Sequence, residues 1–72
     1  MYNLSLFGKR LKSERKKYGM SQTELSELTN IPQPYISEYE NKGRMPTLIN
    51  LIVLSEELNC SIGYLLGGDK ND

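Results

Sequence analysis

The fold is decided by residues 21–41, which read SQTELSELTNIPQPYISEYEN. Ser21 and Glu24 have the spacing of a capping box, in which each side chain satisfies a backbone N–H group at the start of a helix. Asn30 is the residue type that, after glycine, most readily adopts the left-handed conformation, so it indicates a tight turn. These signals predict a short helix over residues 22–29.

A second short helix is predicted directly after this turn, over residues 33–41. Pro32 and Pro34 fit its first turn, because backbone N–H groups there have no intrahelical partner. Helical spacing directs three residues inward, namely Ile36, Tyr39 and Glu40. The outer face is left with small or polar residues, namely Gln33, Pro34, Ser37, Glu38 and Asn41. Two short helices joined by a tight turn form a helix-turn-helix unit.

Three more helices complete the expected all-α fold, and each has an expected core-facing set. In the helix over residues 4–18, ended by Gly19, the set is Leu4, Phe7, Leu11 and Tyr18. In the helix capped by Thr47 and ended by Asn59, it is Leu48, Leu51, Ile52, Ser55 and Leu58. In the last helix, capped by Ser61, it is Ile62, Leu65 and Leu66. Leu25 and Leu28 are expected to face the core from the helix over residues 22–29.

The length of 72 residues indicates one domain around a single core. We expect this domain over residues 1–66, followed by a polar tail or linker stub over residues 67–72. Whether a larger C-terminal domain once followed is left open. No apolar run approaches the roughly 18 residues that cross a bilayer, and no secretory signal pattern is present, so we expect a soluble cytoplasmic protein without a membrane partner.

Histidine is absent and Cys60 is the only cysteine. The chain therefore has neither the commonest metal ligand nor the usual general base, and it cannot form an internal disulfide. We expect no catalytic site, no metal and no cofactor, which makes an enzyme the least supported class. Cys60 is interpreted as a small buried hydrophobic residue rather than a redox switch.

Charge is balanced overall but polarised along the chain. Nine basic and nine acidic residues give a net charge of zero, which on its own argues against a nucleic-acid partner. Residues 1–20, however, contain six basic residues against Glu14 alone, a local charge of +5, and the remaining 52 residues carry −5. Taken alone, such a run is most simply a solvated helix face. The six basic residues are Lys9, Arg10, Lys12, Arg15, Lys16 and Lys17.

From Phe7 to Leu66 the sequence resembles the phage-repressor (Cro/C1, Xre-like) helix-turn-helix family. The resemblance is carried, in one register, by Ser21-Gln22, Ile36-Ser37, Tyr39-Glu40-Asn41, Arg44-Met45-Pro46-Thr47 and the closing CSIGYLLG of residues 60–67. It implies a compact five-helix, lambda-repressor-like domain that binds double-stranded DNA in a sequence-specific manner. It also implies a homodimer on a palindromic operator and a role as a transcriptional repressor, with the helix over residues 33–41 in the major groove.

Base reading is expected from the outward side chains Gln33, Pro34, Ser37 and Glu38, and the resemblance places Gln33, Pro34 and Glu38 at base-reading positions. The Gln33 amide suits adenine N6 and N7. Pro34 departs from the polar residue usual at its position and offers only apolar contact, for instance to a thymine methyl. Glu38 either accepts from cytosine N4 or remains a solvated carboxylate that discourages wrong sites.

Contacts to the phosphate backbone are implied for Gln22, which would also brace Gln33, and for Asn41, Lys42 and Arg44. The simpler interpretations are an ordinary first helical residue for Gln22 and a flexible charged loop for the other three. The resemblance further implies a structural ion pair between Arg15 and Glu40, which would join the first helix to the third.

Ile49 and Val53 lie four residues apart and off the expected core face. Two interpretations remain open, namely a dimer contact shared with Tyr64 or the last helix, and simple packing at the edge of the core. Tyr2 and Tyr35 are the tyrosines expected to be free, which gives only weak support to stacking on single-stranded bases.

Several functions fit this sequence. The favoured one is a dimeric repressor of phage, prophage or mobile-element type. A controller of a restriction–modification system and an antitoxin that represses its own operon share the same features. From another class, a protein-interaction module that has lost DNA binding is favoured only by the zero net charge, Glu38 and Pro34. Retention of duplex DNA at low salt separates that class from the others.

Overall fold

The computed structural model describes residues 4–68, which form five α-helices and no strand. The helices are α1 (Leu4–Lys17), α2 (Gln22–Thr29), α3 (Gln33–Asn41), α4 (Leu48–Glu57) and α5 (Ile62–Leu65). The predicted all-α, five-helix class is therefore confirmed. Tyr2 and residues 69–72 of the predicted tail lie outside the described residues.

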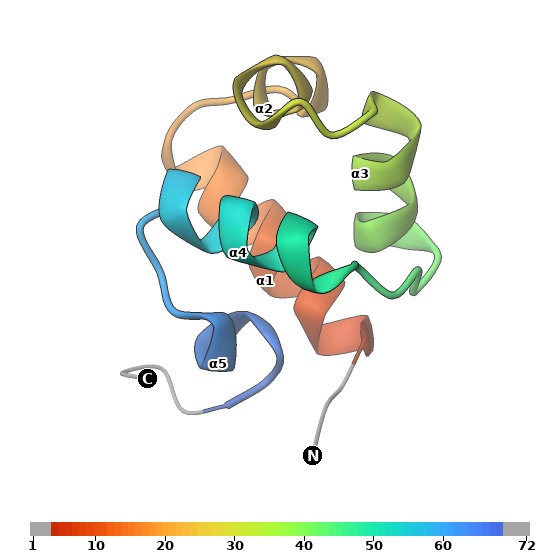
Figure 1. The fold of residues 1–72 in the computed structure, drawn as a ribbon, viewed down its shortest axis with the longest axis vertical. Helices are drawn as coiled ribbons and strands as arrows, with labels where there is room; N and C mark the ends of the chain where they lie inside the picture. The colour runs from red at the N-terminus through yellow and green to blue at the C-terminus, as the bar shows by residue number, and fades with distance from the viewer. Residues whose placement is uncertain (1–3, 69–72) are drawn as a thin grey trace.

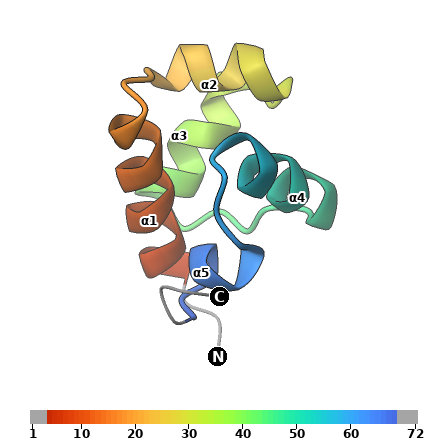
Figure 2. The same cartoon turned by 90° about the vertical axis from the view of Figure 1, so that its left-hand side faces the viewer.

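The five helices share one hydrophobic core, and Figures 1 and 2 show how they are arranged. The first helix packs against α3 and α5, while α2 contacts α3 and α4, and α4 also contacts α5. In Figure 2, α2 crosses one end of the bundle and α5 lies at the other end. Between residues 4 and 68 no helix combines the length and the hydrophobicity needed to span a bilayer.

Helices α2 and α3 have the predicted bounds. Ser21 Oγ accepts a hydrogen bond of 3.0 Å from the Glu24 backbone N–H, and the Glu24 carboxylate accepts one of 2.8 Å from the Ser21 N–H. The chain then turns at Asn30, whose φ is +60°. Both parts of the capping box and the left-handed turn are therefore present, and together they set the short spacing between α2 and α3.

Side-chain caps also begin the last two helices. Thr47 Oγ1 accepts from the Asn50 N–H at 3.1 Å, and Ser61 Oγ accepts from the Tyr64 N–H at 3.0 Å. Asn59 adopts the left-handed conformation, with φ of +52°, just after the end of α4. The capping residues identified in the sequence therefore mark these helix ends correctly.

All five helices contribute buried residues to the core, and one aromatic pair joins α1 to α3. The rings of Phe7 and Tyr39 are 5.7 Å apart in an edge-to-face arrangement, and the Tyr39 hydroxyl accepts a hydrogen bond of 3.0 Å from Asn50 Nδ2 on α4. The buried hydrophobic residues are Phe7, Leu11, Leu25, Ile31, Ile36, Tyr39, Leu51, Leu54, Leu58 and Leu65.

Gly8 allows α1 and α3 to approach closely. A Cβ atom built on Gly8 would lie 2.5 Å from the Tyr39 carbonyl oxygen and 3.0 Å from that of Glu40. These distances are too short for a side chain, and both neighbours belong to the backbone of α3. Any larger residue at this position would therefore have to push the two helices apart.

Three of the expected core residues, Tyr18, Leu28 and Leu48, are exposed instead. Leu28 is 53% exposed because the buried line of α2 runs from Leu25 to Thr29. Tyr18, at 48%, comes after the last residue of α1, at the start of the turn.

On α4, Leu48 is 68% exposed, since the buried line follows Leu51, Leu54, Ser55 and Leu58. Leu54 is fully buried although the sequence pattern did not assign it to the core, and Ile52 is only partly buried. The core face of α4 is therefore rotated relative to the predicted one.

Candidate nucleic-acid interface

The second helix of the helix-turn-helix unit presents its polar side to the outside. Pro34 and Asn41 are exposed, while Gln33, Ser37 and Glu38 are partly exposed. In contrast, Ile36 and Tyr39 on the opposite side are fully buried. The outer face of α3, defined here as Gln33, Pro34, Ser37, Glu38 and Asn41, is therefore available to a partner.

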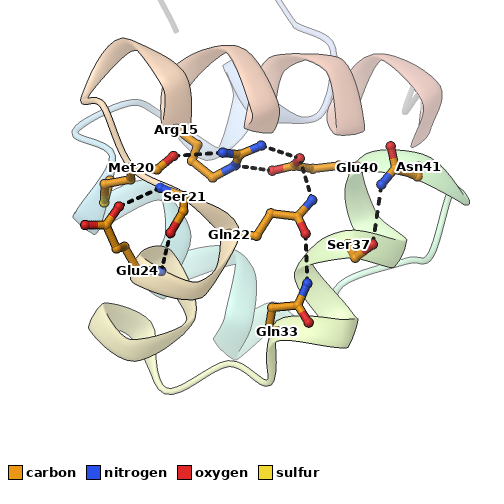
Figure 3. Close-up of polar contacts among 9 residues, drawn as sticks. All are labelled: Arg15, Met20, Ser21, Gln22, Glu24, Gln33, Ser37, Glu40 and Asn41. Atoms are coloured by element: carbon orange, nitrogen blue, oxygen red, sulfur yellow. Dashed lines mark hydrogen bonds and ion pairs between the residues drawn. The ribbon is translucent and has the colours of Figure 1, made fainter.

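Beneath this face lies a buried ion pair between α1 and α3 (Figure 3). Arg15 Nε donates to Glu40 Oε2 at 2.8 Å, and a second guanidinium nitrogen donates to Oε1 at 2.9 Å. A third nitrogen of Arg15 donates to the Met20 carbonyl at 2.7 Å. The Arg15 side chain is 8% exposed and that of Glu40 is fully buried. The hydrogen bond to Glu40 raises the pKa of Arg15, and the ion pair expected from the sequence is present.

Two glutamines extend this contact to the outer face. Gln22 Nε2 donates to Glu40 Oε1 at 3.1 Å, and Gln33 Nε2 donates to Gln22 Oε1 at 2.8 Å. Figure 3 shows this chain of contacts running from α1 to the first turn of α3. An amide nitrogen carries two hydrogens, so Gln33 retains one donor and its carbonyl acceptor after bonding Gln22. Gln33 is thus held in place without losing the two groups that an adenine edge requires.

Further along α3, Ser37 and Asn41 follow Gln33 at intervals of four residues (Figure 3). Asn41 Nδ2 lies 3.4 Å from Ser37 Oγ, a long hydrogen bond. Such a weak contact is easily exchanged for a bond to another acceptor. Both side chains can therefore be offered to a partner.

The loop after α3 places its two cations differently. Lys42 is exposed, and among residues 4–68 no carboxylate lies within 4.0 Å of its ammonium group. Arg44, in contrast, donates to Glu38 Oε1 at 2.6 Å, and its guanidinium carbon lies 3.9 Å from the centre of the Tyr35 ring. The sequence did not indicate this cluster of Tyr35, Glu38 and Arg44. Arg44 is six residues from Glu38 and nine from Tyr35, so it meets them only because the chain reverses in the loop.

Arg10 also has a position that the sequence did not indicate. Its guanidinium donates to the backbone carbonyls of Tyr64 and of Gly68, the latter at 2.6 Å, and lies 4.3 Å from the centre of the Tyr64 ring. Arg10 therefore ties α1 to α5 and to the segment that follows it. The other basic residues of α1, apart from Arg15, are exposed, and they are Lys9, Lys12, Lys16 and Lys17.

The residues expected at a dimer contact have mixed exposure. Ile49 is 68% exposed, Val53 is half-buried, and Tyr64 is half-buried with Arg10 on its ring. Cys60 packs against the core, and burial raises the pKa of its thiol. No set of three residues among positions 4–68 has the side chains and spacing of a metal site.

Residues 11–65 match the family model described as helix-turn-helix. The chain belongs to the phage-repressor-like helix-turn-helix family. In this member of the family, the Arg15–Glu40 ion pair and the capping box of α2 stabilise the helix-turn-helix unit.

Three relatives of this helix-turn-helix chain are informative. The transcriptional regulator ImmR of Bacillus subtilis is 44% identical over 63 residues, which cover 88% of this chain and 50% of ImmR. The repressor protein C2 of Salmonella phage P22 is 37% identical over 93% of this chain and 31% of C2. The control protein C.SmaI of Serratia marcescens is 35% identical over 93% of this chain and 82% of C.SmaI. The chain thus spans half or less of the length of ImmR and C2.

The fold agrees with these sequence relationships. A crystal structure of the P22 c2 repressor in complex with a synthetic operator has a TM-score of 0.83 and 38% identity to this chain, over 89% of this chain and 97% of that one.

Proposed function

We propose that this chain is a sequence-specific transcriptional regulator of the phage or prophage repressor type, which inserts α3 into the major groove of double-stranded DNA. The observation that carries the proposal is the braced Gln33, an amide held by Gln22 at the start of an exposed polar helix face. A major groove is about 12 Å wide and admits one α-helix, so the exposed polar face of α3 can lie against base edges. We infer that this regulator binds its DNA in the cytoplasm.

In this arrangement, the outer face of α3 reads base edges. Gln33 pairs with adenine, Pro34 offers an apolar contact, and Ser37 supplies a small hydroxyl that can serve as donor or acceptor. The Arg15–Glu40 pair does not touch DNA but fixes Gln22, and through it Gln33. Rotation of the first reading side chain is thereby restricted before DNA binds, which lowers the entropic cost of binding.

Backbone contacts flank the reading residues. Gln22 lies at the N-terminus of α2 and is partly exposed, while Asn41 and Lys42 close α3 on the exposed side. Lys42 provides a cation without a carboxylate partner among residues 4–68, suited to displacing counterions from phosphates. The exposed lysines of α1 add long-range attraction. Arg44 is treated separately below, because its guanidinium is already bound by Glu38.

We further propose that two copies bind a palindromic operator, with their α3 helices in successive major grooves about 34 Å apart. Ile49 is the strongest candidate for the contact between copies, because it is a large apolar side chain with 68% of its surface exposed at the start of α4. Val53 follows it by one helical turn. Tyr64 is the weaker member of the set, since Arg10 covers its ring.

A controller of a restriction–modification system is a second candidate function. It is favoured by the likeness to C.SmaI, which extends over 82% of that protein. Both candidates use the same DNA-binding surface, and they differ in the genes beside the operator. Mapping the bound sites on the source genome distinguishes them.

The proposed function is tested by selecting bound sequences from a random duplex pool at low salt. We expect enrichment of one motif with two inverted halves. A pool that is retained without enrichment would leave only non-specific binding, while no retention at any salt concentration would favour a protein-interaction module. A pool of single-stranded DNA is the control for the duplex requirement.

A further inference from the structure

The loop after α3 folds back onto the outer face of that helix. Gly43 has a φ of +67°, and the next residue, Arg44, donates its backbone N–H to the Glu38 carbonyl at 3.3 Å. The Arg44 side chain reaches the Glu38 carboxylate as well, at 2.6 Å, while its guanidinium stacks on Tyr35 at 3.9 Å. Backbone and side-chain contacts therefore both hold Arg44 beside Glu38.

This contact changes how Glu38 would meet DNA. The Glu38 side chain is 38% exposed on the outer face of α3, where an unpaired carboxylate would be repelled by phosphates. The positive charge of the Arg44 guanidinium offsets the carboxylate charge locally. The hydrogen bond to Glu38 raises the pKa of Arg44, which remains a cation at any physiological pH. The Glu38–Arg44 pair can thus approach DNA without net repulsion.

One carboxylate oxygen is left for a partner. Arg44 bonds Oε1 of Glu38, and no donor among residues 4–68 bonds Oε2. An ionised carboxylate accepts hydrogen bonds and donates none. In the major groove, guanine presents the acceptors N7 and O6 and thymine presents the acceptor O4, and none of these can bond a carboxylate. Adenine presents its N6 amino donor next to the acceptor N7. Cytosine presents its N4 amino donor without an acceptor of its own beside it, so it is the base that best fits Oε2.

We propose that Glu38 reads a cytosine amino group in the operator, and that Arg44, held on Tyr35, is the positioning residue that neutralises and orients this carboxylate. This inference deepens the function proposed above and rests on it. It also assigns Arg44 a different role from Lys42. Lys42 grips phosphate independently of the reading face, whereas Arg44 acts through Glu38.

The test is a double-mutant cycle on DNA binding by the whole chain. Operators are first selected from random duplex DNA by the wild type and by Glu38→Gln. We expect one position that favours cytosine in the wild type, by about tenfold over other bases. This preference disappears in Glu38→Gln or moves to adenine, whose edge suits an amide.

The second arm compares Arg44→Ala in the wild-type and Glu38→Gln backgrounds by fluorescence anisotropy. The loss of affinity should be large in the wild-type background and several-fold smaller in the Glu38→Gln background, because the amide has no charge to neutralise. Lys42→Ala is the matched control and should weaken binding by the same factor in both backgrounds. Thermal unfolding of each variant verifies that it is folded.

Two outcomes overturn the assignment. Equal losses for Arg44→Ala in both backgrounds would make Arg44 an ordinary phosphate ligand, and an unchanged motif in Glu38→Gln would remove Glu38 from base reading. Both presuppose that the wild type binds duplex DNA. If it retains none, the proposed function itself fails, and the base-reading role fails with it.

Discussion

Gly8 on α1 lies directly against the Tyr39 carbonyl of α3, at a distance that leaves no space for a Cβ atom. The position of α3 relative to α1 is therefore set by the smallest possible residue. Because Gln33, Ser37 and Glu38 project from the same helix, this backbone contact also sets where the outer face of α3 stands.

Replacing Gly8 by alanine should lower the free energy of unfolding by about 1–3 kcal/mol, the usual cost of overpacking a tight core. The built Cβ would meet backbone atoms, which cannot rotate away as a flexible side chain can. Chemical denaturation measures the effect. Ser13→Ala, an exposed change on α1, is the control and should stay within about 0.5 kcal/mol of the wild type. Equal stabilities for the two variants would refute the close approach.

Arg15→Ala should destabilise the protein by about 3–5 kcal/mol, because it leaves the fully buried Glu40 carboxylate without a cation. The double variant Arg15→Ala with Glu40→Gln should regain part of this loss, since no charge remains buried. Urea denaturation of the wild type, both single variants and the double variant gives the comparison. Additive losses in the double variant would contradict the pairing.

Gln22→Ala and Gln33→Ala should relax base preference at the same position of the operator, because a hydrogen bond of 2.8 Å joins the two side chains. Non-specific affinity should change little for Gln33→Ala. Lys42→Ala should instead weaken all sequences alike and reduce the salt slope by about one unit. Binding selections and salt titrations measure the two effects. If Gln22→Ala weakens all sequences alike, as Lys42→Ala does, and leaves the base preference unchanged, Gln22 does not brace the reading residue.

Replacing Ile49 by lysine should weaken operator binding and dimer formation without unfolding the chain, since 68% of this side chain is already exposed. Sedimentation at increasing protein concentration and the steepness of operator titrations report the association. Met45→Lys, a change at an equally exposed apolar residue in the preceding loop, is the control. Unchanged sedimentation and binding for Ile49→Lys would exclude it from the contact between copies.

Local signals in the sequence predicted much of the fold. Ser21, Glu24 and Asn30 act within a few residues of one another, so their pattern alone predicts where α2 begins and ends. Leu28 and Leu48 were assigned to the core wrongly, because the buried face of a short helix depends on where its neighbours pack.

The sequence predicted part of the candidate site as well. The Arg15–Glu40 pair and the outer face of α3 followed from the family resemblance and helical spacing, and the structure contains that pair and leaves that face accessible. The contact of Arg44 with Glu38 and Tyr35 was not predictable, because it depends on the backbone reversal near Gly43.

The central claim is that α3 occupies the major groove. Dimethyl sulfate tests it directly, since this reagent methylates guanine N7 in the major groove and adenine N3 in the minor groove. On a selected operator, we predict protection of guanine N7 in two patches about one helical turn apart, with adenine N3 still reactive between them. Protection of adenine N3 with fully reactive guanine N7 would contradict the account.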